Sequence, residues 1–154
     1  MRHVLRLGLM AGLLLMLVPS MARAQASADD YAWAGACKDC HEKYYTAWEK
    51  TKHSNAIMRL SGSEREAGGK CIACHTTAVP ELLDKNVNEG IQCEACHGPG
   101  KAHIAAAAAG ETKPGKITRV PAEKICVACH SAKSPHFKYF SYDAMKGLVH
   151  QVPK

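Results

Sequence analysis

The longest apolar run of the chain lies close to its beginning. Residues 7–18 are apolar throughout, two arginines precede them, and Ala-Arg-Ala at residues 22–24 fits the small-x-small pattern of a cleavage site. The run is shorter than the about 20 apolar residues that a membrane span requires. We therefore expect residues 1–24 to be a cleaved secretory signal peptide, with an uncleaved anchor as the alternative, and residues 25–154 to form a single domain.

After this leader, apolar positions recur at helical spacing and nowhere alternate over any useful length. An alanine-rich segment ends at Gly110, a residue that commonly stops a helix, and a tract with Pro114 and Gly115 indicates a loop over residues 111–121. The expected fold class is mostly α, with short helices and loops and little or no β-sheet. The predicted helices are residues 39–50, 102–109 and 122–130, and a last one capped by Ser141 with Tyr142, Met145 and Val149 on one face.

Composition argues against a large hydrophobic core and against nucleic-acid binding. The chain of 154 residues contains two Trp, two Phe and five Tyr, so few large side chains are available to fill an interior. The formal net charge is +6, but three of the positive charges are arginines of the expected leader. The remainder is too mild for a nucleic-acid partner, and the lysines are spread along the chain.

The cysteine pattern carries the most specific chemistry. All eight cysteines fall into four C-x-x-C pairs, and a histidine follows each pair directly. C-x-x-C-H is the attachment signal of c-type haem, because two thiols bond to the porphyrin edge and the histidine ligates the iron. The pattern predicts four covalently attached c-type haems, around which the short helices and loops would wrap. The attaching residues would be Cys37, Cys40, Cys71, Cys74, Cys93, Cys96, Cys126 and Cys129, and the proximal ligands His41, His75, His97 and His130.

Three other uses of paired cysteines fit less well. Zinc sites use C-x-x-C pairs but do not require a histidine after every one of them. Redox-active pairs belong to a thioredoxin-like strand and helix pattern that is not visible here, and disulfides imply no histidine rule. If haems are bound, they would replace the missing apolar core, and we expect the haem-free chain to be largely unfolded.

A low-spin haem iron needs a second strong ligand, usually histidine or methionine. Without the leader the chain keeps Met58 and Met145 and four further histidines, as many as there are expected irons. Ligation by two histidines would give low reduction potentials. The count alone does not exclude ordinary surface histidines. The candidates for the second ligand are His53, His103, His136 and His150.

Several segments resemble the tetrahaem cytochromes of the cytochrome c-554 family. The most specific reads G-I-Q-C-E-A-C-H-G-P-G-K-A-H over residues 90–103, and the first motif with its following Trp48 and His53 is also similar. Ser-Pro-His-Phe at residues 134–137 and the late histidine at 150 resemble the end of that family. His136 is a departure from the family pattern, and the chain is shorter than the family leads us to expect.

The resemblance implies a ligand set for each iron. His103 would serve the haem of His41, His53 that of His97, and His150 that of His130, while the haem of His75 would be five-coordinate. His136 could close that remaining iron, ligate in place of His150, or do neither.

The expected function is that of a periplasmic electron carrier rather than an enzyme. Closely packed haems would pass electrons between redox proteins, such as other multihaem cytochromes or a quinone-linked membrane partner, with no nucleic-acid partner and no membrane span in the mature chain. The alternatives use a five-coordinate iron, either in a small reductase of nitric oxide or nitrite or in a gas-binding module. No set of distal donors can be assigned for the first, and the chain is too short to carry a signalling domain for the second.

Overall fold

The computed structural model describes residues 26–66, 69–77 and 90–151, so the expected signal peptide lies outside the described residues. Within these ranges the chain is helical, and its one β-type contact is an isolated parallel bridge between Thr76 and Gly90. The prediction of a mostly helical fold is confirmed. The elements are η1 (Ala28–Asp30), α1 (Trp33–Glu49), η2 (Ala56–Arg59), α2 (Gly62–Glu66), α3 (Gly69–His75), α4 (Cys93–His97), α5 (Lys101–Ala108), α6 (Glu123–Val127), α7 (Tyr142–Met145) and η4 (Lys146–Leu148).

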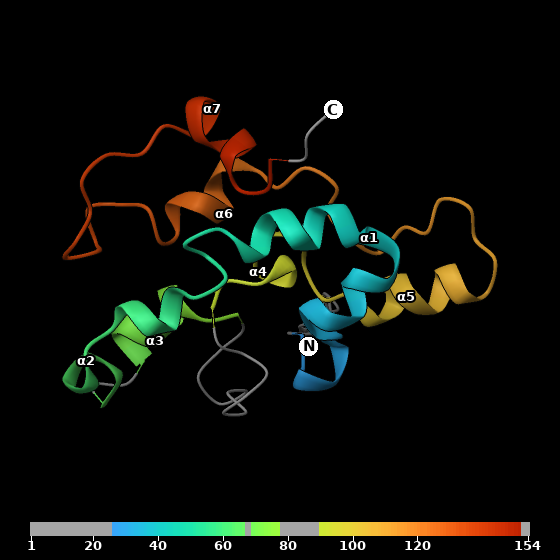
Figure 1. The fold of residues 1–154 in the computed structure, drawn as a ribbon, viewed down its shortest axis with the longest axis horizontal. Coiled ribbons are helices and arrows are strands. Elements are labelled where there is room, and N and C mark those ends of the chain that lie inside the picture. The colour runs from blue at the N-terminus through green and yellow to red at the C-terminus, as the bar shows by residue number, and fades with distance from the viewer. Residues whose placement is uncertain (1–25, 67–68, 78–89, 152–154) are drawn as a thin grey trace, which may run out of the picture.

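The elements are arranged around α1, which crosses the middle of the molecule (Figure 1). Helices α2 and α3 lie at one end of the long axis and α5 at the other, while α6 and α7 form a separate arm above α1. Helix α4 makes the most contacts with α1. Because α1 and α4 carry the first and third cysteine motifs, this packing brings those two motifs together.

The longest helix, α1, includes the predicted segment 39–50 but begins earlier, at Trp33. At His41 the backbone leaves the helical region, with φ of −125° and ψ of 39°, so α1 consists of two stretches joined by a kink. Further along, the buried Trp48 donates a hydrogen bond of 2.7 Å from its indole nitrogen to the carbonyl of Ile91. The kink falls at the expected haem ligand of the first motif.

The later helices agree with their predictions except at their ends. Helix α5 stops at Ala108, Gly110 follows in a left-handed conformation (φ +89°), and residues 111–121 form a loop, as expected. Helix α6 is shorter than predicted and ends at Val127, although His130 still donates its backbone N–H to the carbonyl of Cys126. Ser141 holds the N-cap position of α7, but its hydroxyl makes no capping hydrogen bond, so the predicted side-chain cap is wrong.

Burial is confined to one part of the described chain. The buried residues all lie between Ala34 and Gly100, and none of the described residues after Gly100 is buried. No helix in the described ranges is long and apolar enough to span a membrane. In the part of the chain that the structure describes, the buried apolar side chains are few, as the composition predicts, and they are Ala34, Trp48, Ala56, Ile57 and Leu60.

Candidate haem sites

Each cysteine pair lies on or beside a single helical turn. The first motif lies in α1, the second ends α3, the third forms α4 and the fourth begins in α6. Residues three apart on a helix project from the same face, so both thiols of a pair can reach one porphyrin edge. All eight cysteines are described and none forms a disulfide, so every pair keeps both thiols.

Two pairs of candidate ligands face each other with nearly parallel rings. The imidazoles of His41 and His103 have centroids 6.4 Å apart and planes inclined by 24°. Those of His97 and His150 are 6.2 Å apart and inclined by 17°. With metal–nitrogen bonds of about 2 Å, two imidazoles on opposite sides of one iron have centroids roughly 6 Å apart. Both pairs therefore have the separation that a shared haem iron requires.

A third pair joins the fourth motif to the loop after α1. The rings of His130 and His53 are 6.0 Å apart, inclined by 64°, and Phe140 stacks on the His130 ring at 4.9 Å. Burial, followed by the nearby His130, lowers the pKa of His53, which keeps this imidazole neutral and able to bind a metal.

The pairing differs from the one implied by the family resemblance. That resemblance joined His53 to His97 and His150 to His130, whereas the structure places His150 opposite His97 and His53 opposite His130. The pairing of His41 with His103 is the same in both. The exchange follows from the path of the arm, which lies above α1 (Figure 1). His150 packs edge-on against Tyr44 of α1, and His130 of the fourth motif lies beside His53 in the loop after α1.

Backbone carbonyls orient three of the imidazoles. The Nδ1 atom of His75 lies 2.8 Å from the carbonyl of Ala56, and that of His97 lies 2.5 Å from the carbonyl of Thr118. His103 Nδ1 is 3.0 Å from the carbonyls of Pro114 and Gly115. An Nδ1–H that donates to a carbonyl leaves Nε2 as the free acceptor, which is the arrangement found in metal-bound histidines.

Two candidate ligands have no histidine opposite them. All eight histidines after the leader are described, and no histidine ring lies within stacking distance of His75. The His136 side chain is 76% exposed, and its Nε2 lies 3.4 Å from Glu64 Oε1 on α2. His75 is therefore oriented as a proximal ligand by the carbonyl of Ala56 but has no histidine opposite it among the described residues. His136 is directed toward a carboxylate.

Gly90 positions His53, and the sequence pattern gives no sign of this role. Ile91 donates its backbone N–H to the carbonyl of His53 at 2.7 Å. Gly90 has φ of +87°, and a Cβ at this position would lie 2.2 Å from the carbonyl oxygen of Ser54. Only glycine tolerates both that conformation and that approach. The residues before the third motif therefore hold the backbone of a candidate ligand of the fourth.

Tyr44 was also missed. Its ring lies edge-on to His41 at 6.4 Å and to His150 at 5.3 Å, so one aromatic side chain bridges two ligand pairs. Its position three residues after His41, on the same helix, was the available signal.

Thiols from different motifs lie side by side. A hydrogen bond to Cys93 and burial raise the pKa of Cys37, and the same bond lowers the pKa of Cys93. Burial and a hydrogen bond to Cys74 raise the pKa of Cys129 to about 12. Burial, followed by the charge of Cys126, raises the pKa of Cys96 to about 11. The motifs therefore adjoin in the order second, fourth, third, first.

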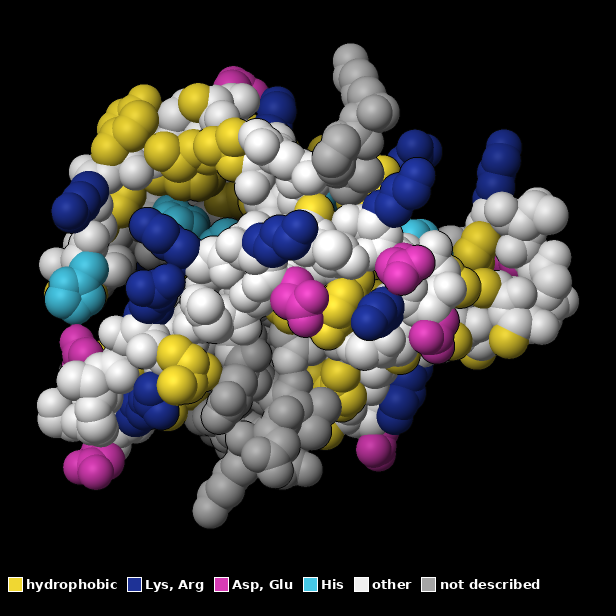
Figure 2. All heavy atoms as spheres, viewed as in Figure 1, with side chains coloured by type: hydrophobic (Ala, Val, Ile, Leu, Met, Phe, Trp, Pro, Cys, Tyr) yellow, Lys and Arg dark blue, Asp and Glu magenta, His cyan; other side chains and the backbone are white. Residues whose placement is uncertain are grey.

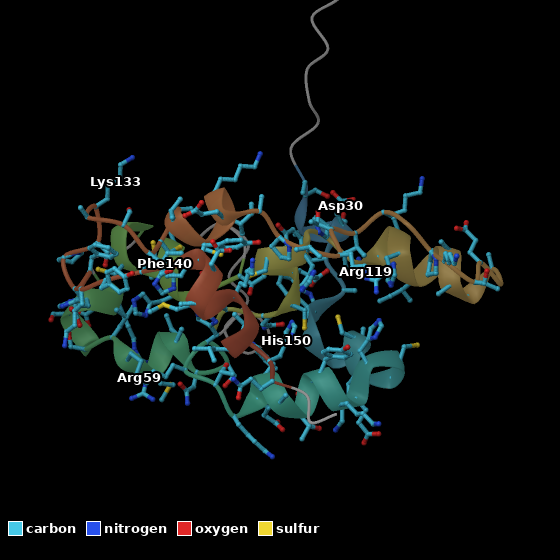
Figure 3. The ribbon with its side chains drawn as sticks, turned by 90° about the horizontal axis from the view of Figure 1, so that it is seen from above. Asp30, Arg59, Arg119, Lys133, Phe140 and His150 are labelled. Atoms are coloured by element: carbon cyan, nitrogen blue, oxygen red, sulfur yellow. The ribbon has the colours of Figure 1, made fainter. Side chains whose placement is uncertain are left out.

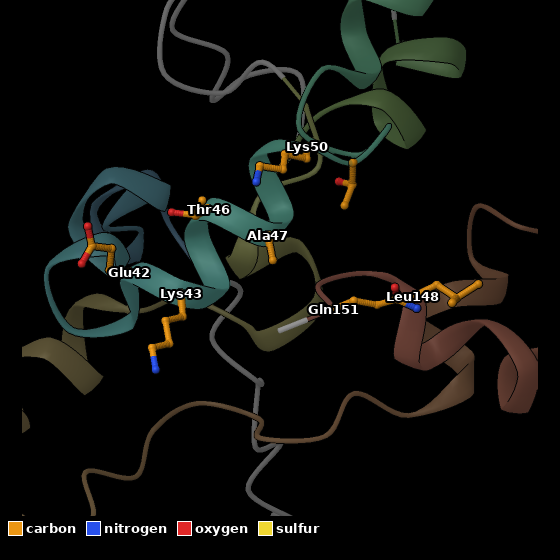
Figure 4. Close-up of a pocket in the computed structure, with 8 residues that line it drawn as sticks. Glu42, Lys43, Thr46, Ala47, Lys50, Leu148 and Gln151 are labelled. Atoms are coloured by element: carbon orange, nitrogen blue, oxygen red, sulfur yellow. The ribbon is translucent and has the colours of Figure 1, made fainter. Parts of the chain in front are cut away.

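The spaces beside these residues are open and partly basic. A cavity of about 740 Å³ lies between α1 and the segment around His150 (Figure 4). It is lined by Lys43 of α1, by Lys50 directly after this helix, and by Leu148 and Gln151 of that segment. Histidine side chains are visible in a hollow between the arm and the end that carries α2, and Lys and Arg side chains stand around its mouth (Figure 2). Among the described residues, no three His, Cys, Asp or Glu side chains converge as a zinc site would require.

Fold and sites together define a mostly helical protein with four C-x-x-C-H motifs and paired imidazoles. Comparison with known proteins agrees. Residues 36–98, which include the first three motifs, match the family model described as cytochrome c554 and c-prime. Over this segment the chain is similar to the cytochrome c554 family.

Two matches are to cytochrome c-554 of Nitrosomonas europaea, one in sequence and one in structure. Its cytochrome c-554 is 26% identical over 124 residues, which cover 66% of this chain and 51% of the relative. The chain thus spans about half the length of the curated relative it matches. The solved structure of reduced cytochrome c554 is 20% identical, with a TM-score of 0.49 over 73% of this chain and 74% of that one.

Proposed function

We propose that the protein is a tetrahaem c-type cytochrome that carries electrons between redox proteins. The eight cysteines would hold four haems, with His41, His75, His97 and His130 as proximal ligands. The observation that carries this proposal is the set of three facing imidazole pairs, whose centroids are 6.0 to 6.4 Å apart. Each pair combines a motif histidine with a histidine from another part of the chain. The distal ligands would be His103 for the haem of His41, His150 for that of His97 and His53 for that of His130.

The order in which the thiols adjoin supports a continuous electron path. Each sulfur marks a porphyrin edge, because the cysteines attach at the vinyl groups. Cys74 beside Cys129, Cys126 beside Cys96, and Cys93 beside Cys37 bring neighbouring edges together. Electrons would therefore pass between the haem of the second motif and that of the first through the fourth and the third.

The proposed function includes a location in the periplasm and other redox proteins as partners. A cleaved leader at residues 1–24 would export the remaining single domain to the periplasm, where covalent attachment prevents loss of haem. A carrier of this kind exchanges electrons at exposed haem edges with other redox proteins, such as multihaem cytochromes or a quinone-linked membrane protein.

The haem number is tested by the mass of the intact, matured protein, followed by a redox titration. We expect four haems and four one-electron steps, with low midpoints for the three irons that have two histidines. Fewer haems, or four midpoints that are all well positive, would contradict the proposal.

Electron flow is tested by removing one haem at a time. Replacing Cys126 and Cys129 with Ala removes the haem in the middle of the path, and we expect slow equilibration between the haem of His75 and the other two. Replacing Cys71 and Cys74 removes the terminal haem and should leave the other three in rapid exchange. Equally rapid equilibration among the remaining haems in both variants would refute the order.

One observation favours a second candidate function, reduction or capture of a small gas or nitrogen oxide. Among the residues that the structure describes, no histidine lies opposite His75, so the iron above it could keep an open position. Turnover of nitric oxide or nitrite with a chemical reductant would show a reductase, and binding without turnover would show a gas-binding role. If neither occurs, the protein acts as a carrier alone.

A further inference from the structure

A buried carboxylate joins the segments that carry the first and third motifs. Glu94 stands between the two cysteines of the third motif and is 2% exposed. Its Oε1 accepts hydrogen bonds from the backbone N–H groups of Ala32 (2.8 Å) and Gly100 (2.6 Å), and its Oε2 accepts one from Trp33 (2.8 Å). Three N–H donors are the partners that an ionised carboxylate takes.

These contacts fix the ends of two helices. Ala32 and Gly100 are the residues directly before α1 and α5, which carry His41 and His103. Trp33 has φ of +65°, an uncommon conformation for a bulky residue, and it is held there by Glu94 and by stacking on Tyr31 at 5.3 Å. The neighbouring Gln92 accepts a further hydrogen bond from Ala34 at 2.8 Å.

The charge of Glu94 is balanced by backbone dipoles alone within the described residues. No Lys, Arg or His side chain there forms an ion pair with it. A buried charge is screened much less than an exposed one, so its field reaches the neighbouring groups. The charge of Glu94 acts on one cysteine of each motif. It contributes to the raised pKa of Cys37, after the hydrogen bond to Cys93 and burial. It also acts to raise the pKa of Cys93, against the larger lowering effect of the hydrogen bond to Cys37.

We propose that Glu94 sets the reduction potentials of the haems attached to the first and third motifs. A ferric haem carries one more positive charge than a ferrous haem, so a buried negative charge beside the first and third motifs would stabilise the oxidised forms of the haems attached there and lower both potentials. Burial and local charge are among the means by which a protein tunes a haem. The inference rests on the proposed haem attachment and assigns Glu94 a positioning and tuning role that a spacer residue of the motif would not have.

The test compares redox titrations of the matured protein and its Glu94→Gln variant. Glutamine keeps an acceptor for Ala32 and Gly100 and removes the charge. We expect two of the four steps to shift toward easier reduction by about tenfold in the reduction equilibrium, which is 59 mV for one electron. Glu123→Gln is the matched control, because Glu123 is exposed and lies three residues before Cys126. Its loss should move every step by less than about twofold.

Gln92→Glu provides the reciprocal change, since it adds a charge at a residue that is 7% exposed in the same cluster. The same two steps should shift toward harder reduction. Unchanged midpoints in either variant, or an equal shift of all four steps, would overturn the role of Glu94. The haem number is measured first, by mass, in the unmodified protein. Fewer than four haems there refutes the proposed function, whereas four haems with unshifted midpoints in the variants refutes only the inference about Glu94.

Discussion

The two halves of the described chain are held together differently. Between Ala34 and Gly100, buried side chains and long-range hydrogen bonds join α1 to α4, through Glu94, Gln92 and the indole of Trp48. From residue 101 to residue 151 no described residue is buried. The arm of this second half meets the first chiefly through ring pairs at His130 and His150.

The difference shows which half of the molecule is held in place by its own side chains and which half would be held in place by bound haem. Figure 3 shows Phe140 and His150 of the arm over the body of the molecule and Lys133 at its edge. The arm is placed by candidate ligands rather than by a core. The family match, at residues 36–98, coincides with the half that has a protein core. The predictions below test this contrast, from the largest expected effect to the smallest.

Loss of all haems should have the largest effect. In a chain produced without haem attachment, we expect amides of residues 101–151 to exchange hydrogen at nearly unprotected rates and residues 34–100 to keep at most partial protection. The five apolar residues that are buried in the described part of the chain are too few for a stable core. Hydrogen exchange and a thermal melt followed by circular dichroism measure this. A cooperative melt of the haem-free chain would show that haem is not the missing core.

Gly90→Ala should be the most damaging single substitution in the first half. The new Cβ would lie 2.2 Å from the carbonyl oxygen of Ser54, in a backbone conformation that disfavours alanine. We expect a loss of roughly 3 kcal/mol in the free energy of unfolding and weakened ligation by His53. Denaturant titration and the low-spin haem bands report the two effects.

Gly110→Ala is its matched control. Gly110 has nearly the same φ, +89°, but nothing lies within 4 Å of a Cβ there. The conformational cost alone should be about 1 kcal/mol. Equal costs at the two glycines would mean that the approach of residue 90 to Ser54 contributes nothing to stability.

Thr77→Val tests the hydrogen bonds of the same half. Thr77 is fully buried, and its hydroxyl donates to the carbonyl of Gly90 at 3.1 Å and accepts from the N–H of Gln92 at 2.7 Å. Valine keeps the shape and leaves both groups unpaired, which should cost about 1–3 kcal/mol. Thr112→Val in the exposed loop should change stability by less than about 0.5 kcal/mol, and a similar change at both threonines would count against the role of Thr77.

His136→Gln should have the smallest effect. The side chain is exposed, and its partner among the described residues is Glu64, whose pKa is lowered first by hydrogen bonds from Ser61 and then by His136. We expect unchanged haem bands and an unchanged unfolding midpoint. Loss of a low-spin band in this variant would show that His136 is an iron ligand, which would contradict its exposed position beside Glu64.

The local features of the molecule were predictable, and the contacts between distant segments were not. Alanine-rich composition predicted α5 and helical spacing predicted most of α1, because those segments depend on neighbouring residues. The C-x-x-C-H spacing identified the candidate sites. The partners of His53 and His150 could not be deduced, since a distal histidine is brought to its place by the path of the whole chain. Gly90 and Glu94 were missed for the same reason, because Gly90 approaches Ser54 and Glu94 bonds to Ala32, and each of these partners lies more than thirty residues away in the sequence.

The most direct test of the account is the visible spectrum of the reduced, matured protein with and without carbon monoxide. Three irons with facing histidine pairs should stay low-spin, and the iron of His75 should bind the gas, so about one quarter of the haem absorption is expected to change. No change would mean that every iron has two ligands and that the haem of His75 is closed. A change in half of the absorption or more would mean that the imidazole pairs seen in the structure do not ligate iron.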